Sequence, residues 1–271
     1  MVAEQISALQ ENGIGYIEVR GVDEQNITAL SLQQAKELAA QLERANIRVW
    51  SIGSPIGKIK ITDDFAPDLK LLEHTAQIAQ ILGCDKIRMF SFYMPDNDPN
   101  ACETYRDEVF SRISAYLETA NKYGVTLCHE NEKSIYGDTL ERCLVLHRAF
   151  PQLKAVFDPA NFAQCGENPL QAFHALTPYL SYIHIKDVDS AGQIVPPGEG
   201  VCDIAGIVSA YAAAGGSVMT LEPHLMEFCG LSALENGEKS AVTNLYQSTR
   251  DAFDDAAKHL KEIVRKTVSA E

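Results

Sequence analysis

The sequence predicts an α/β fold, a TIM (β/α) barrel formed as one domain over residues 1–271. Short runs rich in β-branched and aromatic residues alternate with longer segments of helical periodicity, which is typical of repeated βα units and a parallel sheet. The chain has 271 residues, of which 46% are apolar, and (β/α) barrels commonly occupy about 250 residues as a single domain. Beyond the βα period, no repeat and no Pro/Gly/Ser-rich linker divides the chain.

Seven segments have the composition and length of barrel strands. They are Tyr16–Gly21, Ile47–Ile52, Lys86–Ser91, Val125–Glu130, Ala155–Asp158, Tyr182–Asp187 and Val218–Glu222. Amphipathic segments at 31–46, 66–83, 105–124 and 249–266 are predicted to form helices of the outer ring, and several end in Asn or Gly, where a helix stops. The 249–266 segment carries its acidic residues early and its basic residues late, as the helix dipole favours.

A complete barrel has eight strands, but here a helix-like segment precedes the first predicted strand. We therefore predict a barrel that lacks its first β-strand, with the gap before residue 14. Truncation, a misplaced start or an unassigned strand would each account for the gap. An open barrel edge exposes unpaired backbone groups and favours association into a homo-oligomer.

Charge and cysteine content restrict the partners and the compartment. A formal charge of −14 and a pI near 4.9 repel polyphosphate backbones, so we expect a small-molecule partner and no nucleic acid. Seven scattered cysteines without a CxxC pair indicate reduced thiols and a cytoplasmic location. No run approaches the roughly 18 apolar residues of a membrane helix, so we expect no membrane association.

Four of the predicted strands carry a side chain able to bind a metal at or near the carboxyl end: Glu130, Asp158, His184 and Glu222. In a (β/α) barrel these strand ends share one face, so residues far apart in the sequence converge there. Three carboxylates and one imidazole suit manganese, magnesium, cobalt or zinc, and we expect manganese. The alternative for any one of these acids is a helix cap or a solvated loop position, but four such residues in register favour a metal site.

The segments GVTLCHENE, FDPANF, YIHIKD and TLEPH together resemble the xylose isomerase-like TIM barrels. That family includes sugar and sugar-phosphate isomerases, ketose 3-epimerases, inosose dehydratase and endonuclease IV. The resemblance runs from Ile14 to the last helix. It implies that Glu130, Asp158, His184 and Glu222 bind one divalent ion and that the two glutamates exchange a proton on opposite faces of the substrate.

This assignment is chemically consistent, because a carbon acid next to a carbonyl is too weak for a carboxylate base unless the enediolate oxygens are stabilised. A divalent ion supplies that stabilisation, and positioned acid/base groups contribute a further 10²–10⁴-fold, an order-of-magnitude figure. Two carboxylates on opposite faces permit epimerisation, whereas one carboxylate on one face suits isomerisation.

Five more residues are candidates for substrate binding. Lys186 and Glu132 each follow a predicted ligand by two residues, so their side chains are expected to point the same way as that ligand. The alternative for Lys186 is an ordinary lysine of the barrel rim. The alternative for Glu132 is that it replaces Glu130 as the metal ligand. Arg88 lies near a strand end, where a buried cation needs an anionic partner. His224 and Asn161 are also candidates for substrate contact. The alternative for His224 is an ordinary loop histidine, and the alternative for Asn161 is a residue that stabilises a turn.

Other polar residues have structural interpretations or little context. Lys58 and Glu199 resemble pocket-lining positions, and the loop 190–203 is the longest irregular insert and a candidate lid. Histidines on helices or on the opposite strand face are predicted to be structural, and Cys128 is predicted to belong to the core. These histidines are His74, His129, His147 and His174.

The sequence therefore predicts a metal-dependent isomerase or epimerase of a sugar or sugar phosphate. An inosose dehydratase-like lyase would begin with the same proton abstraction, and a non-catalytic metal-binding barrel would keep the site without turnover. A nuclease of the endonuclease IV type needs further histidines on other strands, which the strands ending near Ser51 and Ser91 do not offer.

Overall fold

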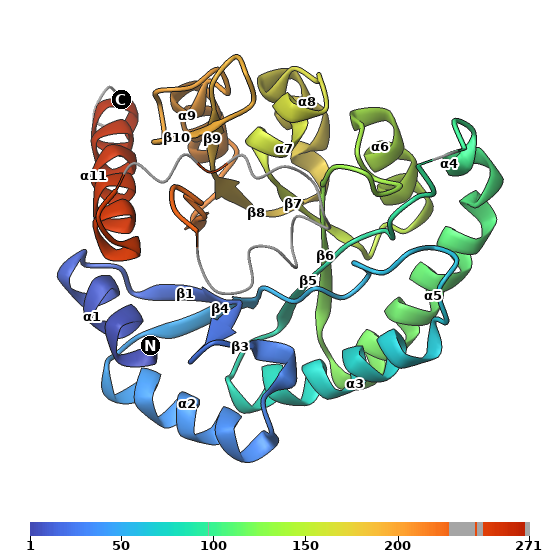
Figure 1. Cartoon of the computed structure of the whole chain (residues 1–271), viewed down its shortest axis with the longest axis horizontal. Coiled ribbons are helices and arrows are strands. Elements are labelled where there is room, and N and C mark those ends of the chain that lie inside the picture. The colour runs from blue at the N-terminus through green and yellow to red at the C-terminus, as the bar shows by residue number, and fades with distance from the viewer. Residues whose placement is uncertain (97, 228–241, 243–245, 269–271) are drawn as a thin grey trace. The chain divides into compact units, whose positions relative to one another are not determined.

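In the computed structural model, the chain alternates strands and helices as predicted and divides into two compact units, Met1–Val156 and Phe157–Glu271. The structure describes residues 1–96, 98–227, 242 and 246–268, and Figure 1 gives the labels of the elements. The elements of the first unit are α1 (Val2–Glu11), β1 (Tyr16–Val19), β2 (Gly21–Val22), β3 (Gln25–Asn26), η1 (Ile27–Ala29), α2 (Leu32–Arg44), β4 (Arg48–Ile52), α3 (Ala66–Ile81), β5 (Lys86–Met89), α4 (Ala101–Thr104), α5 (Arg106–Tyr123), β6 (Thr126–Glu130), α6 (Leu140–Ala149) and β7 (Lys154–Phe157), whose last residue begins the second unit.

A parallel sheet in the order β1-β4-β5-β6-β7 forms the centre of the first unit. Ile52, Ile87 and Leu127 are at most 1% exposed and lie on three consecutive strands of this sheet. Because parallel strands end at the same edge, the carboxyl end of β6, with Glu130 as its last residue, lies at the edge where β4 and β5 also end. Helices α3 and α5 lie side by side along this unit (Figure 1).

The first thirteen residues contain no strand, as predicted. Residues 1–13 form α1 and a turn, so no strand precedes β1 within that segment. All seven predicted strands are present, with bounds shifted by a few residues. Helix α5 ends at Gly124, whose φ of 66° gives the left-handed conformation that glycine adopts at helix ends.

The second unit contains two paired parallel strands, a short hairpin and a series of helices. Its elements are α7 (Pro159–Gln164), α8 (Pro169–Leu176), η2 (Thr177–Tyr179), β8 (Leu180–Ile185), β9 (Asp187–Val188), β10 (Ile194–Val195), α9 (Ile204–Ala213), β11 (Met219–Leu221) and α11 (Thr249–Val268). Strand β11 pairs with β8, and α11 packs beside α9. The amphipathic α11 is the helix predicted at 249–266.

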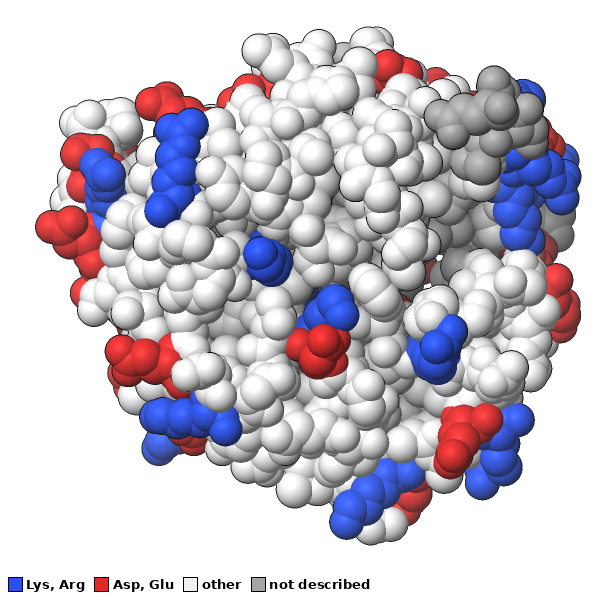
Figure 2. Space-filling model, turned by 180° about the vertical axis from the view of Figure 1, so that it is seen from behind, with Lys and Arg blue, Asp and Glu red and all other residues white. Residues whose placement is uncertain are grey.

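Charged side chains are distributed over both units. On the face shown in Figure 2, the described acidic and basic side chains are interspersed, without one large field of a single sign. Among the described residues, no helix combines the length and apolar character needed to cross a membrane. The six described cysteines are free thiols, Cys128 is fully buried as predicted, and Cys229 lies outside the described residues.

Candidate metal centre

Strands β8 and β11 position a histidine and a glutamate of the second unit. His184 on β8 lies opposite Thr220 on β11, and the backbone N–H of Glu222, just after β11, donates to the carbonyl of Ile185 over 3.1 Å. This parallel register brings His184 Nδ1 within 3.3 Å of Glu222 Oε2. The two residues are therefore neighbours because of strand pairing, although they are far apart in the sequence.

Asp158 reaches the same place from the N-terminus of α7. It caps this helix, since its Oδ1 accepts the backbone N–H of Asn161 over 2.9 Å, and Pro159 follows at the first helical position. The other oxygen, Oδ2, lies 3.8 Å from His184 Nδ1. The cap thus holds one oxygen and directs the other toward the histidine.

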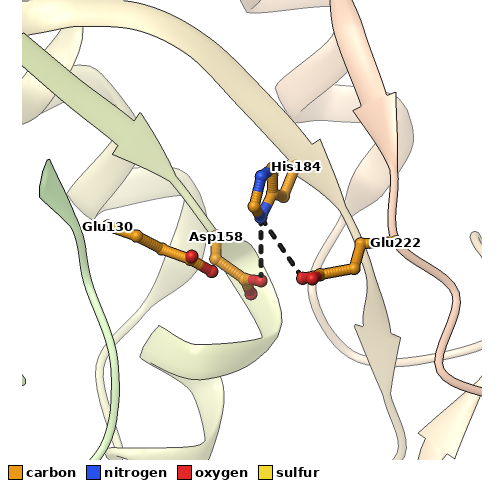
Figure 3. Close-up of side chains that lie close together, drawn as sticks. All are labelled: Glu130, Asp158, His184 and Glu222. Atoms are coloured by element: carbon orange, nitrogen blue, oxygen red, sulfur yellow. Dashed lines mark ion pairs between the residues drawn. The ribbon is translucent and has the colours of Figure 1, made fainter. Parts of the chain in front are cut away.

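Asp158, His184 and Glu222 form a compact cluster, with ion pairs from His184 to both carboxylates (Figure 3). One ligand atom of each residue lies within 4.8 Å of those of the others. The side chains of Asp158 and His184 are at most 1% exposed, and that of Glu222 is 15% exposed. We call these three residues the carboxylate–histidine cluster.

The donor atoms of this cluster suit a divalent ion. Oxygen and imidazole donors bind manganese, magnesium, cobalt and zinc, whereas soft metals prefer thiolates. Donor atoms at about 2.0–2.2 Å from a common ion lie about 3.0–3.5 Å from each other, so the 3.3 Å between His184 and Glu222 fits shared coordination. The residues present therefore fit a metal.

Lys186 lies beside the cluster on the same strand end. Its Nζ is 2.7 Å from Asp158 Oδ2 and 3.8 Å from Glu222 Oε2, and it donates to Asn161 Oδ1 over 2.9 Å. Lys186 and Asn161 are both buried. The structure thus brings two of the candidate substrate-binding residues next to the predicted metal ligands.

Both carboxylates of the carboxylate–histidine cluster have a pKa below its ordinary value. Burial alone raises the pKa of Glu222, but His224 and His184 outweigh burial and hold it well below its ordinary value. Burial likewise raises the pKa of Asp158, and Lys186 together with His184 brings it below its ordinary value. Both carboxylates are therefore ionised at neutral pH, which is the form that binds a cation or accepts a proton.

His224 also contacts the cluster. Its backbone has a positive φ of 46°, which is uncommon for a residue with a side chain. The ring Nε2 lies 3.4 Å from Glu222 Oε1. The candidate histidine of the TLEPH segment thus lies against the glutamate rather than in solvent.

In the first unit, Glu130 forms a buried ion pair with Arg88. Their side chains are 3% and 4% exposed, and Arg88 Nη1 lies 3.1 Å from Glu130 Oε2. Glu18 on β1 lies 3.9 Å from Arg88 Nε and is 8% exposed. The anionic partner predicted for Arg88 is therefore present, whereas the part played by Glu18 was not anticipated from the sequence.

Glu132 contacts a lysine of the same unit. Lys58 Nζ lies 2.9 Å from Glu132 Oε2, with side chains 7% and 17% exposed. Glu199 of the second unit instead lies near the surface, 3.3 Å from His259 Nε2. Of the two pocket-lining candidates, Lys58 is half-buried and Glu199 is exposed.

The histidine on the opposite face of β6 has different neighbours. His129 hydrogen-bonds Ser91 Oγ over 2.9 Å and packs against the ring of His147, with ring centroids 5.9 Å apart. Burial holds the pKa of His129 well below its ordinary value and lowers that of His147 to about 4. His74, on α3, forms a hydrogen bond with the backbone carbonyl of Leu30. His174, on α8, is exposed.

Asp187 has a structural function that the sequence did not reveal. Its carboxylate accepts the backbone N–H groups of Val188, Gly198, Gly200 and Cys202 at 2.9–3.2 Å. The 190–203 segment, predicted as an irregular loop, includes β10 and pairs with β9. The glycines of PPGEG are the available signal, because a Cβ at Gly200 would lie 2.2 Å from Asp187 Oδ1.

A family model described as xylose isomerase-like TIM barrel matches residues 6–264. Among curated proteins, the 3-dehydroshikimate dehydratase of Bacillus anthracis is 25% identical over 186 residues. The matched part spans 68% of this chain and 65% of that protein.

Solved structures share the fold at low sequence identity. L-ribulose 3-epimerase matches with a TM-score of 0.76 and 16% identity, covering 99% of this chain and 90% of that chain. The IOLI protein with a binding zinc atom matches with a TM-score of 0.73 and 17% identity, covering 97% and 92% of the two chains. The family match and these likenesses confirm the predicted fold class.

Proposed function

This chain belongs to the xylose isomerase-like TIM barrel family, and from that premise we propose that it is a divalent-metal-dependent isomerase or epimerase of a sugar or sugar phosphate. The observation that carries the proposal is the carboxylate–histidine cluster, in which a carboxylate with a lowered pKa lies 3.3 Å from a buried imidazole. The proposed ligands are Asp158, His184 and Glu222, with Glu130 as the fourth. Manganese is the proposed ion, with magnesium, cobalt and zinc as alternatives.

The proposed chemistry is removal of a proton from the carbon next to a carbonyl. When bound, the ion supplies positive charge that offsets the negative charge developing on the carbonyl oxygen. Glu222, next to His184 at 3.3 Å, is proposed to accept the proton. Glu130 returns a proton from the opposite face in an epimerase, and a single carboxylate serves both transfers in an isomerase.

Five further residues are proposed to bind and orient the substrate. They are Arg88, Glu132, Asn161, Lys186 and His224. Lys186 and His224 lie next to the proposed ligands, at 2.7 Å from Asp158 and 3.4 Å from Glu222. Lys186 is suited to donate to a substrate oxygen, since its ammonium already donates to Asn161 Oδ1.

A dehydratase is the second candidate, because the curated relative from Bacillus anthracis is a 3-dehydroshikimate dehydratase. Dehydration beside a carbonyl can begin with the same proton abstraction and continue by loss of water from the adjacent carbon. Its product is lighter than the substrate by one water, so the mass of the product distinguishes the two reactions.

The test is exchange of a substrate C–H proton with solvent. Chelator-treated protein reloaded with Mn²⁺ is incubated in deuterated water with ketopentoses, ketohexoses, their phosphates and 3-dehydroshikimate. We expect deuterium at the carbon beside the carbonyl of at least one sugar, with an isomer as product. The Glu222→Gln variant, which keeps the shape but cannot accept the proton, should lower the exchange rate by about 10²–10⁴-fold.

Three outcomes would reject this function. Exchange at the wild-type rate in Glu222→Gln rejects the acid/base assignment, and a dehydrated product replaces the isomerase with the lyase. Stoichiometric metal binding without exchange for any compound indicates a metal-binding barrel without turnover.

A further inference from the structure

We propose that Lys186 competes with the divalent ion for the Asp158 carboxylate and thereby lowers the affinity of the proposed site for metal. The inference rests on the proposed function, because it concerns the ion of the same site. The residues that carry it all belong to the second unit: Asp158, Asn161, His184, Lys186 and Glu222.

The Lys186 ammonium lies against the same two oxygen atoms that face the imidazole of His184. Its Nζ is 2.7 Å from Asp158 Oδ2 and 3.8 Å from Glu222 Oε2. His184 Nδ1 lies 3.8 Å from the first of these oxygens and 3.3 Å from the second. The two carboxylate oxygens of the carboxylate–histidine cluster therefore already contact a cation that belongs to the chain itself.

Lys186 is held in this position at both ends of its side chain. The ammonium donates to Asn161 Oδ1 over 2.9 Å, and the side chain is 6% exposed. At the other end, the carboxylate of the next residue, Asp187, accepts main-chain N–H groups of the segment 188–202 and fixes the backbone there. Separating a buried charge from its partner is costly, so the ammonium stays close to Asp158.

An ion bound to Asp158 Oδ2 lies close to this ammonium. Nζ is 2.7 Å from that oxygen, and metal–oxygen bonds are about 2.0–2.2 Å long, so the two cations are within about 5 Å of each other. Like charges at that separation repel each other, most strongly where burial excludes water. Of the two negative charges of Asp158 and Glu222, Lys186 offsets one, which leaves a single net charge to attract the ion.

Removal of the Lys186 charge should therefore strengthen metal binding. This direction is diagnostic, because damage to the fold or to the ligands weakens metal binding. Loss of an outer-shell residue that supports a ligand also weakens it. A gain of affinity thus distinguishes a competing lysine from a supporting one.

The experiment measures the Mn²⁺ affinity of chelator-treated protein at neutral pH by isothermal titration calorimetry. Lys186→Met removes the ammonium while keeping a side chain of similar length, and it should bind Mn²⁺ about tenfold or more tightly than the wild type. Lys186→Gln removes the charge but keeps an N–H donor, and its affinity should change in the same direction. Lys186→Gln decides the question if a thermal melt shows that Lys186→Met does not fold.

Two matched variants separate the local charge from other effects. Lys186→Arg keeps the positive charge and should leave the Mn²⁺ affinity close to the wild-type value. Lys258→Met removes the charge of an exposed lysine on α11 of the same unit, and it should also leave the affinity unchanged.

Equal or weaker Mn²⁺ binding in the folded Lys186→Met or Lys186→Gln protein overturns the inference, and so does an equal gain in Lys258→Met. Tighter binding in the neutral Lys186 variants without C–H exchange by the wild type supports the competition and rejects the proposed reaction. C–H exchange by the wild type with no gain of affinity in these variants rejects the competition alone. No metal binding by the wild type or the variants rejects the metal site, and the competition with it.

Discussion

Two buried histidines on strands show how neighbouring side chains separate a structural residue from a metal ligand. His129 on β6 and His184 on β8 are each 1% exposed. His129 meets a serine hydroxyl and another imidazole, whereas His184 lies within 3.8 Å of two carboxylates. Burial and position along the strand are therefore alike in both cases, and the neighbours that each strand face provides make the difference.

The largest effect expected from this comparison is on metal binding. His184→Ala removes a nitrogen donor from the carboxylate–histidine cluster and should weaken Mn²⁺ binding by about 100-fold or more, because loss of a supporting outer-shell contact already costs about 10–100-fold. The measurement is calorimetric titration of chelator-treated protein. His174→Ala, which changes an exposed histidine of the same unit, is the matched control.

Unchanged stoichiometric metal binding in His184→Ala would remove His184 from the ligand set. It would also remove the distinction between the two histidines on which the comparison depends.

The corresponding substitution of His129 in the first unit should lower the stability of the fold and leave metal binding unchanged. His129→Ala removes the bond to Ser91 and leaves a cavity beneath Gly137, whose Cβ position lies 2.4 Å from the His129 ring. We expect a loss of about 3 kcal/mol in the free energy of unfolding, with Mn²⁺ affinity unchanged. Chemical denaturation followed by metal titration tests both parts. A large loss of metal affinity at native stability would contradict the structural assignment.

The smallest effect concerns the pH dependence of stability. The pKa of His147 is lowered from 6.5 to about 4 by burial, so between these values the unfolded chain gains a proton that the folded chain does not. His147 therefore makes no difference above pH 6.5 and destabilises the fold as the pH falls, by about 2 kcal/mol at pH 5. His147→Asn should reduce this slope in denaturation series from pH 7 to 5. An unchanged slope would show that His147 titrates normally.

Much of the fold follows from the order of residues, because periodicity is a local property. The strands expected at Lys86–Ser91 and Val125–Glu130 appear as β5 and β6, each ending within two residues of its predicted bound. The local DPAN sequence of Asp158 and Asn161 likewise forms a capped helix start. Such features depend on residues that are close together in the sequence.

Contacts between side chains of distant segments could not be predicted from the sequence. Lys58 and Glu132 are 74 positions apart, and Glu18 comes near Arg88 only because of the strand order β1-β4-β5. No spacing rule relates such residues, since the loops between strands vary in length. The proximity of Asp158, His184 and Glu222 was anticipated because strand ends meet in a barrel, and that rule concerns the fold rather than any residue pair.

The anchoring of 190–203 by Asp187 has a practical consequence for protein engineering. Gly198, Gly200 and Cys202 hold the segment through their main-chain N–H groups. Of the intervening residues, the side chain of Glu199 is 56% exposed and Val201 as a whole is 55% exposed. Substitutions at Glu199 and Val201 thus change the outer surface while the backbone of the segment is retained. These two positions are therefore suitable for randomisation in a library of variants.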